Sequence, residues 1–189
     1  GRVDGAAVRN ECGLDPSRFT VLYAPTYSPA ASLHLAGEQI VRTLAEAAFN
    51  VIVKLHDRSL DPDTRYTGGV DWRSRMRALE RAGQVKFAEG ADASTYLAAA
   101  DVMVTDHSSV GFEYLVLDRP LIVYDAPDLA TTARINPEKI ELLRSAATVV
   151  RTPDELAAAA RAELAAPSRL SRQRRRVASE MFHAPGTAT

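Results

Sequence analysis

Three groups of polar residues that could bind or react with a phosphate follow apolar runs of the sequence. They are Thr26, His56 and the turn formed by residues 105–109. Because ligands of an open parallel sheet bind beyond the carboxyl ends of its strands, we expect these groups to meet in one cleft. Their imidazole and hydroxyl groups would donate hydrogen bonds to phosphoryl oxygens and stabilise the charge that develops during a transfer reaction.

Ser108 and Ser109 lie where the last of these runs turns into a helix. The backbone N–H groups of Val110 and Gly111 are expected to lack partners inside the helix. A phosphate would then be bound by them, by the serine hydroxyls and by the helix dipole. Gly111 has no Cβ and would allow the ligand a close approach. The alternative is that a serine only caps its helix, which is a common use of serine there.

Glu113 and His56 each have a functional and an ordinary interpretation. Glu113 lies one helical turn beyond Ser109 on the same face, where its carboxylate could accept hydrogen bonds from ribose hydroxyls. It could equally be an ordinary surface carboxylate. His56 either donates to a phosphoryl oxygen or is a loop histidine without a special role. Asp106 and His107 are adjacent in sequence, and we predict that they position the turn.

Short apolar runs that alternate with helical patterns must position these side chains. The runs are apolar throughout rather than at every second residue, which is typical of a parallel sheet covered by helices on both faces. We therefore predict an α/β fold with a doubly wound, Rossmann-like parallel sheet. Strands are expected at 20–24, 51–55, 85–87, 102–104, 120–124 and 147–150, and helices at 33–48, 72–82, 92–100, 108–116 and from 153 onward.

The segments between and after these elements are also assigned from the sequence. We expect Asn50 to break the first helix and the polar residues 57–70 to form a loop. Residues 1–166 are predicted to form one domain. Residues 167–189 are predicted to be a C-terminal helical tail outside the core, with its arginines on a solvated face.

The composition limits the classes of protein to which the chain can belong. Its 189 residues, 46% of them hydrophobic, suit one domain with or without a tail. A formal net charge of −1 gives no field that would attract nucleic acid. The single cysteine cannot form an internal disulfide and favours a reducing, cytoplasmic setting. No cluster of histidines or cysteines predicts a metal site, and no apolar run reaches the about 20 residues that span a membrane.

Four sequence motifs resemble those of the CDP-glycerol glycerophosphotransferase family, which comprises teichoic-acid-type polymerases and primases with the GT-B fold. The resemblance covers nearly the whole chain, including residues 1–4 and residues 182–189. The stretch from Asp106 to Pro120 is its most specific part. The four motifs are Leu22-Tyr23-Ala24-Pro25-Thr26, Lys54-Leu55-His56, residues 105–114 and Leu117-Asp118-Arg119-Pro120.

The resemblance implies that residues 1–166 are the donor-binding, C-terminal half of a GT-B transferase. Such an enzyme moves a polyol phosphate from a CDP-linked donor to a cell-envelope polymer or glycolipid, without a bound metal or another cofactor. His56 matches a histidine that contacts phosphate and is important for activity. Ser108 and Ser109 would hold the diphosphate, and Thr26 and Glu113 would complete the donor site.

The resemblance also implies partners outside this chain. The acceptor site and the general base would belong to an N-terminal GT-B domain, so that this chain alone is expected to be inactive. The enzyme is expected in the cytoplasm, in peripheral contact with the inner face of the cell membrane.

Two departures from the family's motifs leave other functions open. His56 is followed by Asp57 and not by the proline often found there, and residues 130–136 contain no Arg-Gly motif. A UDP-sugar donor, as in GT-B glycosyltransferases and UDP-N-acetylglucosamine 2-epimerases, is therefore a second interpretation. A non-catalytic nucleotide-binding or protein-interaction module is the third.

Overall fold

Within the described residues, the sheet of this protein has six strands, and all of them are parallel. The computed structural model describes residues 3–83, 85–90 and 92–182, so that the resemblance at residues 1–2 and 183–189 lies outside the described part. The strands are β1 (Thr20–Tyr23), β2 (Asn50–Lys54), β3 (Val85–Ala88), β4 (Val102–Thr105), β5 (Leu121–Tyr124) and β6 (Thr148–Val150). Their order is β3-β2-β1-β4-β5-β6, with parallel pairing at every step.

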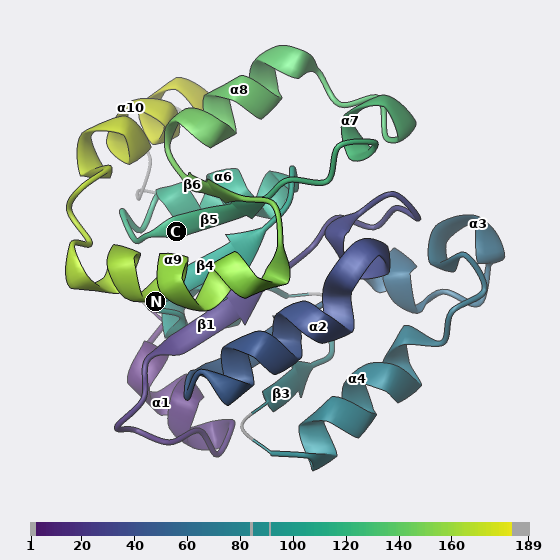
Figure 1. The fold of residues 1–189 in the computed structure, drawn as a ribbon. Helices are drawn as coiled ribbons and strands as arrows, with labels where there is room; N and C mark the ends of the chain where they lie inside the picture. The colour runs from purple at the N-terminus through teal and green to yellow at the C-terminus, as the bar shows by residue number, and fades with distance from the viewer. Residues whose placement is uncertain (1–2, 84, 91, 183–189) are drawn as a thin grey trace.

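Helices cover both faces of the sheet (Figure 1). Val21 and Tyr23 belong to the core cluster that packs against α2 (Ser32–Glu46), α4 (Trp72–Arg81) and α9 (Pro153–Ala165). Leu22 and Met103 belong to the cluster on the opposite face, with α1 (Gly5–Glu11), α5 (Ser94–Ala99), α6 (Ser109–Leu115), α8 (Pro137–Ser145) and α10 (Ser171–Met181). The central strands are apolar throughout because both of their faces are buried. The predicted doubly wound, Rossmann-like fold is confirmed.

The end of α2 differs from the prediction. The helix ends at Glu46, and Ala48 takes a φ of +66° in the turn that follows. Asn50 does not break the helix but is the first residue of β2. Its Nδ2 donates a hydrogen bond to the carbonyl of Asp15 at 2.8 Å, and its Oδ1 accepts one from the Asp15 N–H at 3.2 Å. Asn50 therefore ties the segment before β1 to the start of β2.

The predicted loop at residues 57–70 contains two short helices, η1 (Asp57–Leu60) and α3 (Thr64–Thr67). His56 Nδ1 accepts a hydrogen bond from the N–H of Arg58 at 3.1 Å, at the start of η1. Asp63 Oδ1 accepts one from the N–H of Arg65 at 2.9 Å, at the start of α3. Such side-chain caps stabilise single helical turns in a segment that has no apolar periodicity. A further short helix, α7 (Leu129–Thr132), follows β5.

The expectation that the segment from residue 167 lies outside the core was wrong for α10. Val177 is completely buried in the same cluster as the residues of α6 and α8. Arg174 is only 1% exposed, and its Nε donates to Asp118 Oδ1 at 3.0 Å. Its guanidinium also donates to the carbonyl oxygens of Asp118 and Pro167, at 3.1 and 2.6 Å. The other arginines of the helix are exposed, as expected: Arg172, Arg175 and Arg176.

Replacing Arg174 by methionine should lower the free energy of unfolding by about 2 kcal/mol. Methionine keeps the apolar stem, but Asp118 Oδ1 and two carbonyl oxygens lose the hydrogen bonds that Arg174 donates. Urea unfolding followed by circular dichroism would measure the change. Arg172→Met is the matched control on the exposed side of α10, where we expect a change below about 0.5 kcal/mol. Equal effects of the two substitutions would contradict a bracing role for Arg174.

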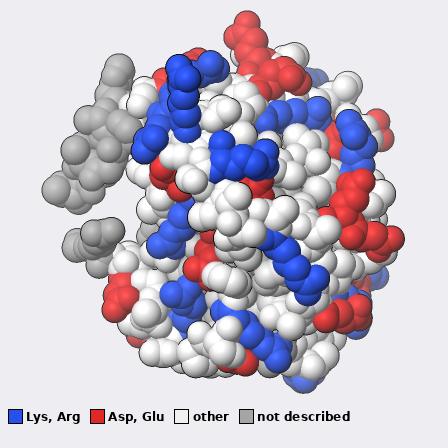
Figure 2. Space-filling view, turned by 60° about the vertical axis from the view of Figure 1, so that its left-hand side comes forward, with Lys and Arg blue, Asp and Glu red and all other residues white. Residues whose placement is uncertain are grey.

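The surface of the described residues carries both signs of charge. Figure 2 shows Lys and Arg side chains interspersed with Asp and Glu over one face of the molecule. Close ion pairs recur, for example between Arg73 and Glu89 at 2.8 Å and between Arg75 and Glu38 at 2.7 Å. In the part of the chain that the structure describes, no helix combines the length and apolar character needed to cross a membrane.

Candidate functional site

The carboxyl ends of β1, β2 and β4 emerge side by side, because β1 pairs with both of its neighbours. They bring together the three groups of residues that the sequence singled out. Two clefts open at this edge of the sheet, and both are lined by His56, Ser108 and Ser109. The predicted convergence of Thr26, His56 and the serine turn is therefore present in the structure.

The two clefts differ in the residues that line only one of them. The first, which we call the Thr26 cleft, has a volume of about 430 Å³ and is also lined by Thr26, Tyr27, Arg65, Tyr66 and His107. The second, which we call the Lys54 cleft, has a volume of about 400 Å³ and is also lined by Lys54, Asp57, Asp92 and Glu113. Both volumes fall within the range of about 300–1,000 Å³ that is usual for small-molecule sites.

Asp106 organises the backbone around the Thr26 cleft. Its carboxylate is completely buried and accepts hydrogen bonds from the N–H of Thr26 at 2.8 Å and of Ser32 at 3.1 Å. The Ser32 hydroxyl donates a third hydrogen bond at 2.8 Å. These contacts fix the loop after β1 and the start of α2. They agree with the prediction that Asp106 positions the turn.

The geometry of His56 determines which nitrogen it presents to a ligand. Its Nδ1 accepts a hydrogen bond from the Arg58 N–H, so the neutral ring carries its proton on Nε2. The Tyr27 ring packs beside the imidazole, with 4.5 Å between the ring centroids. Burial lowers the pKa of His56, while the nearby Asp57 carboxylate opposes this effect. The neutral ring therefore carries an Nε2–H donor, and His56 lines both clefts.

Ser108 occupies the position before the first residue of α6, and its side chain makes no capping hydrogen bond. The interpretation of this serine as a simple helix cap is therefore wrong. The N–H of Gly111 donates to the Ser108 carbonyl at 3.1 Å and is not free for a ligand, contrary to prediction. Because α6 has only seven residues, we expect its dipole to contribute less to phosphate binding than the hydroxyl groups of Ser108 and Ser109.

Gly111 serves packing and not the approach of a ligand. A Cβ on this residue would lie 3.2 Å from Leu143 Cδ2 and 3.3 Å from Thr105 Cγ2. The glycine is buried and faces the contact of α6 with α8 and β4. The prediction that Gly111 allows a ligand to approach is corrected accordingly. Its missing side chain instead allows α6 to lie close to α8 and β4.

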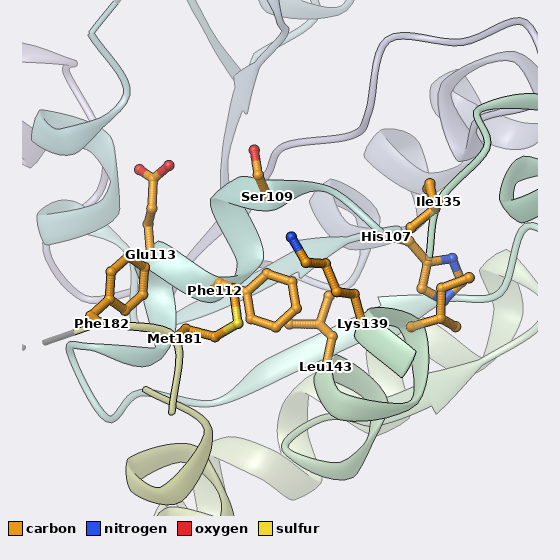
Figure 3. Close-up of a pocket in the computed structure, with 10 residues that line it drawn as sticks. His107, Ser109, Phe112, Glu113, Ile135, Lys139, Leu143, Met181 and Phe182 are labelled. Carbon is orange, nitrogen blue, oxygen red and sulfur yellow. The ribbon is translucent and has the colours of Figure 1, made fainter. Parts of the chain in front are cut away.

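Glu113 lies where the prediction placed it. Its exposed carboxylate and the Ser109 hydroxyl point the same way from α6 in Figure 3, one turn apart. Both residues line the Lys54 cleft. They also line a third cavity of about 280 Å³, which has mostly apolar walls and lies between α6, α8 and the end of α10 (Figure 3). The carboxylate is therefore free to accept hydrogen bonds from a ligand.

Lys54 is a residue of the site that the sequence reasoning did not assign. It is 6% exposed, and its Nζ donates to the Leu55 carbonyl at 2.8 Å. Among the described residues this is the single hydrogen bond that Nζ makes. Two of the three ammonium protons therefore remain for a ligand or water. Burial lowers the pKa of Lys54, and the carboxylates of Asp57 and Asp92 oppose that shift. The signals in the sequence were its place at the end of an apolar strand and in the motif Lys54-Leu55-His56.

His107 is a second residue whose role exceeds the prediction. We expected it to position the turn, but it is 8% exposed and lines the Thr26 cleft. Its Nε2 accepts a hydrogen bond from Arg144 Nε at 3.1 Å, and Arg144 in turn forms an ion pair with Asp125. Its Nδ1 is buried and has no hydrogen-bond partner among the described residues. Nothing near His107 in the sequence announces Arg144, which comes 37 residues later.

The free energy of unfolding should fall when the pH is lowered through the range in which histidines take up a proton. Burial lowers the pKa values of His34, His56 and His107 in the folded protein. The unfolded chain then binds more protons than the folded one, so these residues favour folding above about pH 6.5 and less so as the pH falls. We expect a lower urea midpoint at about pH 5.5 than at about pH 7.5. A midpoint that rises on acidification would contradict the direction of these shifts.

The described residues contain no group of three or more metal-ligating side chains. The side chains that line the two clefts carry hydroxyl, imidazole, ammonium and carboxylate groups. These are the groups that bind a phosphorylated polyhydroxy ligand.

Comparison with known proteins places the chain in a family. Residues 2–185 match the family described as CDP-Glycerol:Poly(glycerophosphate) glycerophosphotransferase. The teichoic acid glycerol-phosphate primase of Bacillus subtilis (strain 168) is 29% identical over 115 residues, which are 55% of this chain and 25% of the primase.

Solved structures show the same fold. The wall teichoic acid polymerase TagF superposes with a TM-score of 0.57 at 17% identity, over 94% of this chain and 42% of the polymerase. The sucrose-phosphate synthase of Thermosynechococcus elongatus gives a TM-score of 0.62 at 18% identity, over 95% of this chain and 45% of the synthase. The chain thus spans less than half the length of each of these proteins. From the match over nearly all of its residues, the chain belongs to the CDP-glycerol:poly(glycerophosphate) glycerophosphotransferase family.

Proposed function

We propose that this chain binds the donor of a transferase that moves a polyol phosphate, such as glycerol phosphate, from a CDP-linked donor to a cell-envelope polymer or glycolipid. The observation that carries this proposal is that His56, Ser108 and Ser109 line both of the clefts at the carboxyl edge of the sheet. Family membership supports the same chemistry. A structure of the similar polymerase TagF was obtained with CDPG.

The diphosphate of the donor would lie on the residues shared by the two clefts. In the reaction, a hydroxyl oxygen of the acceptor attacks the phosphorus that bears the polyol, and the bond from this phosphorus to the bridging oxygen breaks. CMP leaves with the negative charge of that oxygen. The His56 Nε2–H, the serine hydroxyls and the Lys54 ammonium would stabilise this charge.

The nucleoside would occupy the Lys54 cleft. The exposed carboxylate of Glu113 is one helical turn from Ser109 and suits the acceptance of hydrogen bonds from ribose hydroxyls. Placed there, the ribose adjoins the diphosphate at Ser109, as the covalent structure of a CDP-linked donor requires. Thr26 lines the other cleft. Thr26 and Glu113, which were both expected to bind the donor, would therefore contact opposite ends of it.

The acceptor and the general base are proposed to belong to a second, N-terminal GT-B domain. The fraction of similar proteins that this chain covers, 42% of the polymerase and 45% of the synthase, supports this organisation. Residues 1–166 would form the donor-binding unit, and the C-terminal segment 167–189 would brace it through α10. We also propose a peripheral position at the cytoplasmic face of the membrane, where exposed arginines of α10 could contact anionic lipid.

Ligand-dependent thermal stability tests the donor class. A ligand that binds the folded state raises its stability by about 2.7 kcal/mol at a concentration of 100 Kd. We expect CDP-glycerol and CMP to raise the Tm of the full-length protein, and UDP-sugars to raise it less. Stronger stabilisation by a UDP-sugar would favour the sugar transferase or epimerase interpretation. No shift with any nucleotide would favour a non-catalytic interaction module.

A further inference from the structure

We propose that Arg58 and Tyr27 are positioning residues of the transfer reaction, because together they hold the imidazole ring of His56 in one orientation. This inference rests on the proposed function, which gives His56 a part in the reaction. It goes beyond that function because Arg58 lines neither cleft and would influence the reaction through His56.

His56 needs neighbours that restrict the rotation of its side chain. The residue is exposed and follows the last residue of β2 by two positions. Fixing an exposed side chain in one rotamer costs conformational entropy, which contacts with other residues must offset. A reacting group that is already fixed before the substrate binds contributes more to the rate than one that is ordered during the reaction. The contacts of His56 therefore bear directly on turnover.

Tyr27 restricts the imidazole from the neighbouring strand end. Its ring lies beside that of His56, with 4.5 Å between the centroids and 41° between the planes. Tyr27 follows Thr26, whose N–H donates to the buried carboxylate of Asp106 at 2.8 Å. The tyrosine ring is thus carried by a loop that is tied to the core, and it can serve as a fixed wall for the histidine.

Arg58 connects the segment of His56 to this wall. Its backbone N–H donates to His56 Nδ1, and its Nη1 donates to the Tyr27 hydroxyl at 2.8 Å. The guanidinium carbon lies 4.9 Å from the centroid of the Tyr27 ring and 5.1 Å from that of Tyr66 in α3. A cation over an aromatic ring is attracted by the negative face of the ring. Arg58 therefore links the segments that follow β1 and β2 on both sides of His56.

The partners of Arg58 differ from those of the other arginines that stand over aromatic rings. Arg65, Arg75 and Arg77 each also form an ion pair with a carboxylate. Within the described residues Arg58 forms no such pair, and its side chain contacts Tyr27 and Tyr66 instead. These contacts suit a residue that orients its neighbours better than one that balances surface charge.

The charge of Arg58 acts on His56 in the same sense as its contacts. Burial lowers the pKa of His56, the carboxylate of Asp57 raises it, and the charges of Arg58 and Lys54 lower it. Arg58 therefore favours the neutral imidazole, the form whose Nδ1 can accept the backbone N–H of Arg58.

Steady-state kinetics of Arg58→Met in the full-length protein tests the inference. CMP release from CDP-glycerol would be followed, with bacterial membranes supplying the acceptor. Methionine keeps the apolar stem and the backbone N–H but removes the cation and the hydrogen bond to Tyr27. We expect kcat to fall about tenfold and the KM for CDP-glycerol to change less than about twofold. Arg58→Lys should keep most of the kcat, since an ammonium can also stand over the ring and donate to the hydroxyl.

The same substitution in the His56→Ala background separates positioning from a structural role. If Arg58 acts through His56, Arg58→Met should lower kcat in that background by less than about twofold. A structural role would lower kcat by the same factor in both backgrounds. Arg75→Met is the matched control, because Arg75 stands 5.5 Å from the centroid of the Trp72 ring and lines neither cleft. We expect it to have the kcat and KM of the wild type.

Two substitutions of Tyr27 test the other half of the inference. Tyr27→Phe keeps the ring beside His56 and removes the hydroxyl that accepts from Arg58, so we expect kcat to fall about threefold. Tyr27→Leu also removes the ring and should lower kcat at least about tenfold. Because Tyr27→Phe removes a single oxygen atom, it tests the inference even if Tyr27→Leu fails to fold.

Three outcomes would overturn the inference. They are an equal loss of kcat from Arg58→Met in both backgrounds, a raised KM with unchanged kcat, and wild-type kinetics in both Arg58→Met and Tyr27→Phe. A wild-type kcat in His56→Ala itself would instead contradict the proposed function, on which the inference rests. That result is distinct, because it is seen without any substitution of Arg58 or Tyr27.

Discussion

Replacing His56 by alanine is expected to lower the kcat of the full-length transferase about a thousandfold. The neutral imidazole carries Nε2–H, and His56 lines both clefts, which the donor diphosphate is proposed to join. Without it, the leaving CMP loses a hydrogen-bond donor that is fixed in place before the reaction starts. The side chain is exposed and contributes to the fold only by capping η1. The free energy of unfolding should therefore fall by only about 1 kcal/mol. Steady-state turnover and urea unfolding measure the two effects separately.

His56→Asn separates the two functions of the imidazole. Asparagine can still accept the hydrogen bond from the Arg58 N–H, but it has no group at the position of Nε2. We expect His56→Asn to be as stable as the wild type and to turn over as slowly as His56→Ala. His34→Ala is the control histidine, because His34 lies away from both clefts and accepts a hydrogen bond from Trp72 Nε1 at 3.2 Å. Wild-type turnover in His56→Asn would remove His56 from the reaction.

The fold was predictable from the sequence because it depends on burial. Central strands with both faces covered must be apolar at every position, and that pattern is visible without any structure. The end of α2 was not predictable, since the positive φ at Ala48 occurs at a residue type that gives no signal for it. Arg174 was missed for a related reason. Nothing in the sequence around it distinguishes Arg174 from the exposed arginines beside it, and its burial against Asp118, 56 residues earlier, arises only in the fold.

The candidate site shows the same division between local and distant information. The rule that ligands bind at strand ends identified Thr26, His56 and the serine turn, because it needs only the position of each strand. It could not identify the contacts of His107, which accepts a hydrogen bond from Arg144, a residue paired in turn with Asp125. The role given to Gly111 failed because the sequence does not say whether a glycine in a helix faces a ligand or a neighbouring helix.

Lys54→Met is expected to weaken CDP-glycerol and CDP binding about 30-fold each. The Lys54 ammonium is 6% exposed at the end of β2, and two of its protons lack a protein partner among the described residues. A diphosphate bound by His56, Ser108 and Ser109 would supply the negative charge that pairs with this ammonium. Because Lys54 is proposed to bind the diphosphate that CDP and CDP-glycerol share, the affinities for both ligands should fall. Calorimetric titration would give the two affinities.

The stability of Lys54→Met should change in the opposite direction from its affinity. A buried ammonium without a close ion pair is unfavourable in the free protein, and a methionine of similar volume removes that penalty. We expect the free energy of unfolding to rise by about 1 kcal/mol or to stay constant. Lys86→Met, which removes an ammonium 3.3 Å from Glu80, is the control and should leave nucleotide binding intact. A variant that loses stability and keeps its affinity would show that Lys54 supports the fold and not the donor.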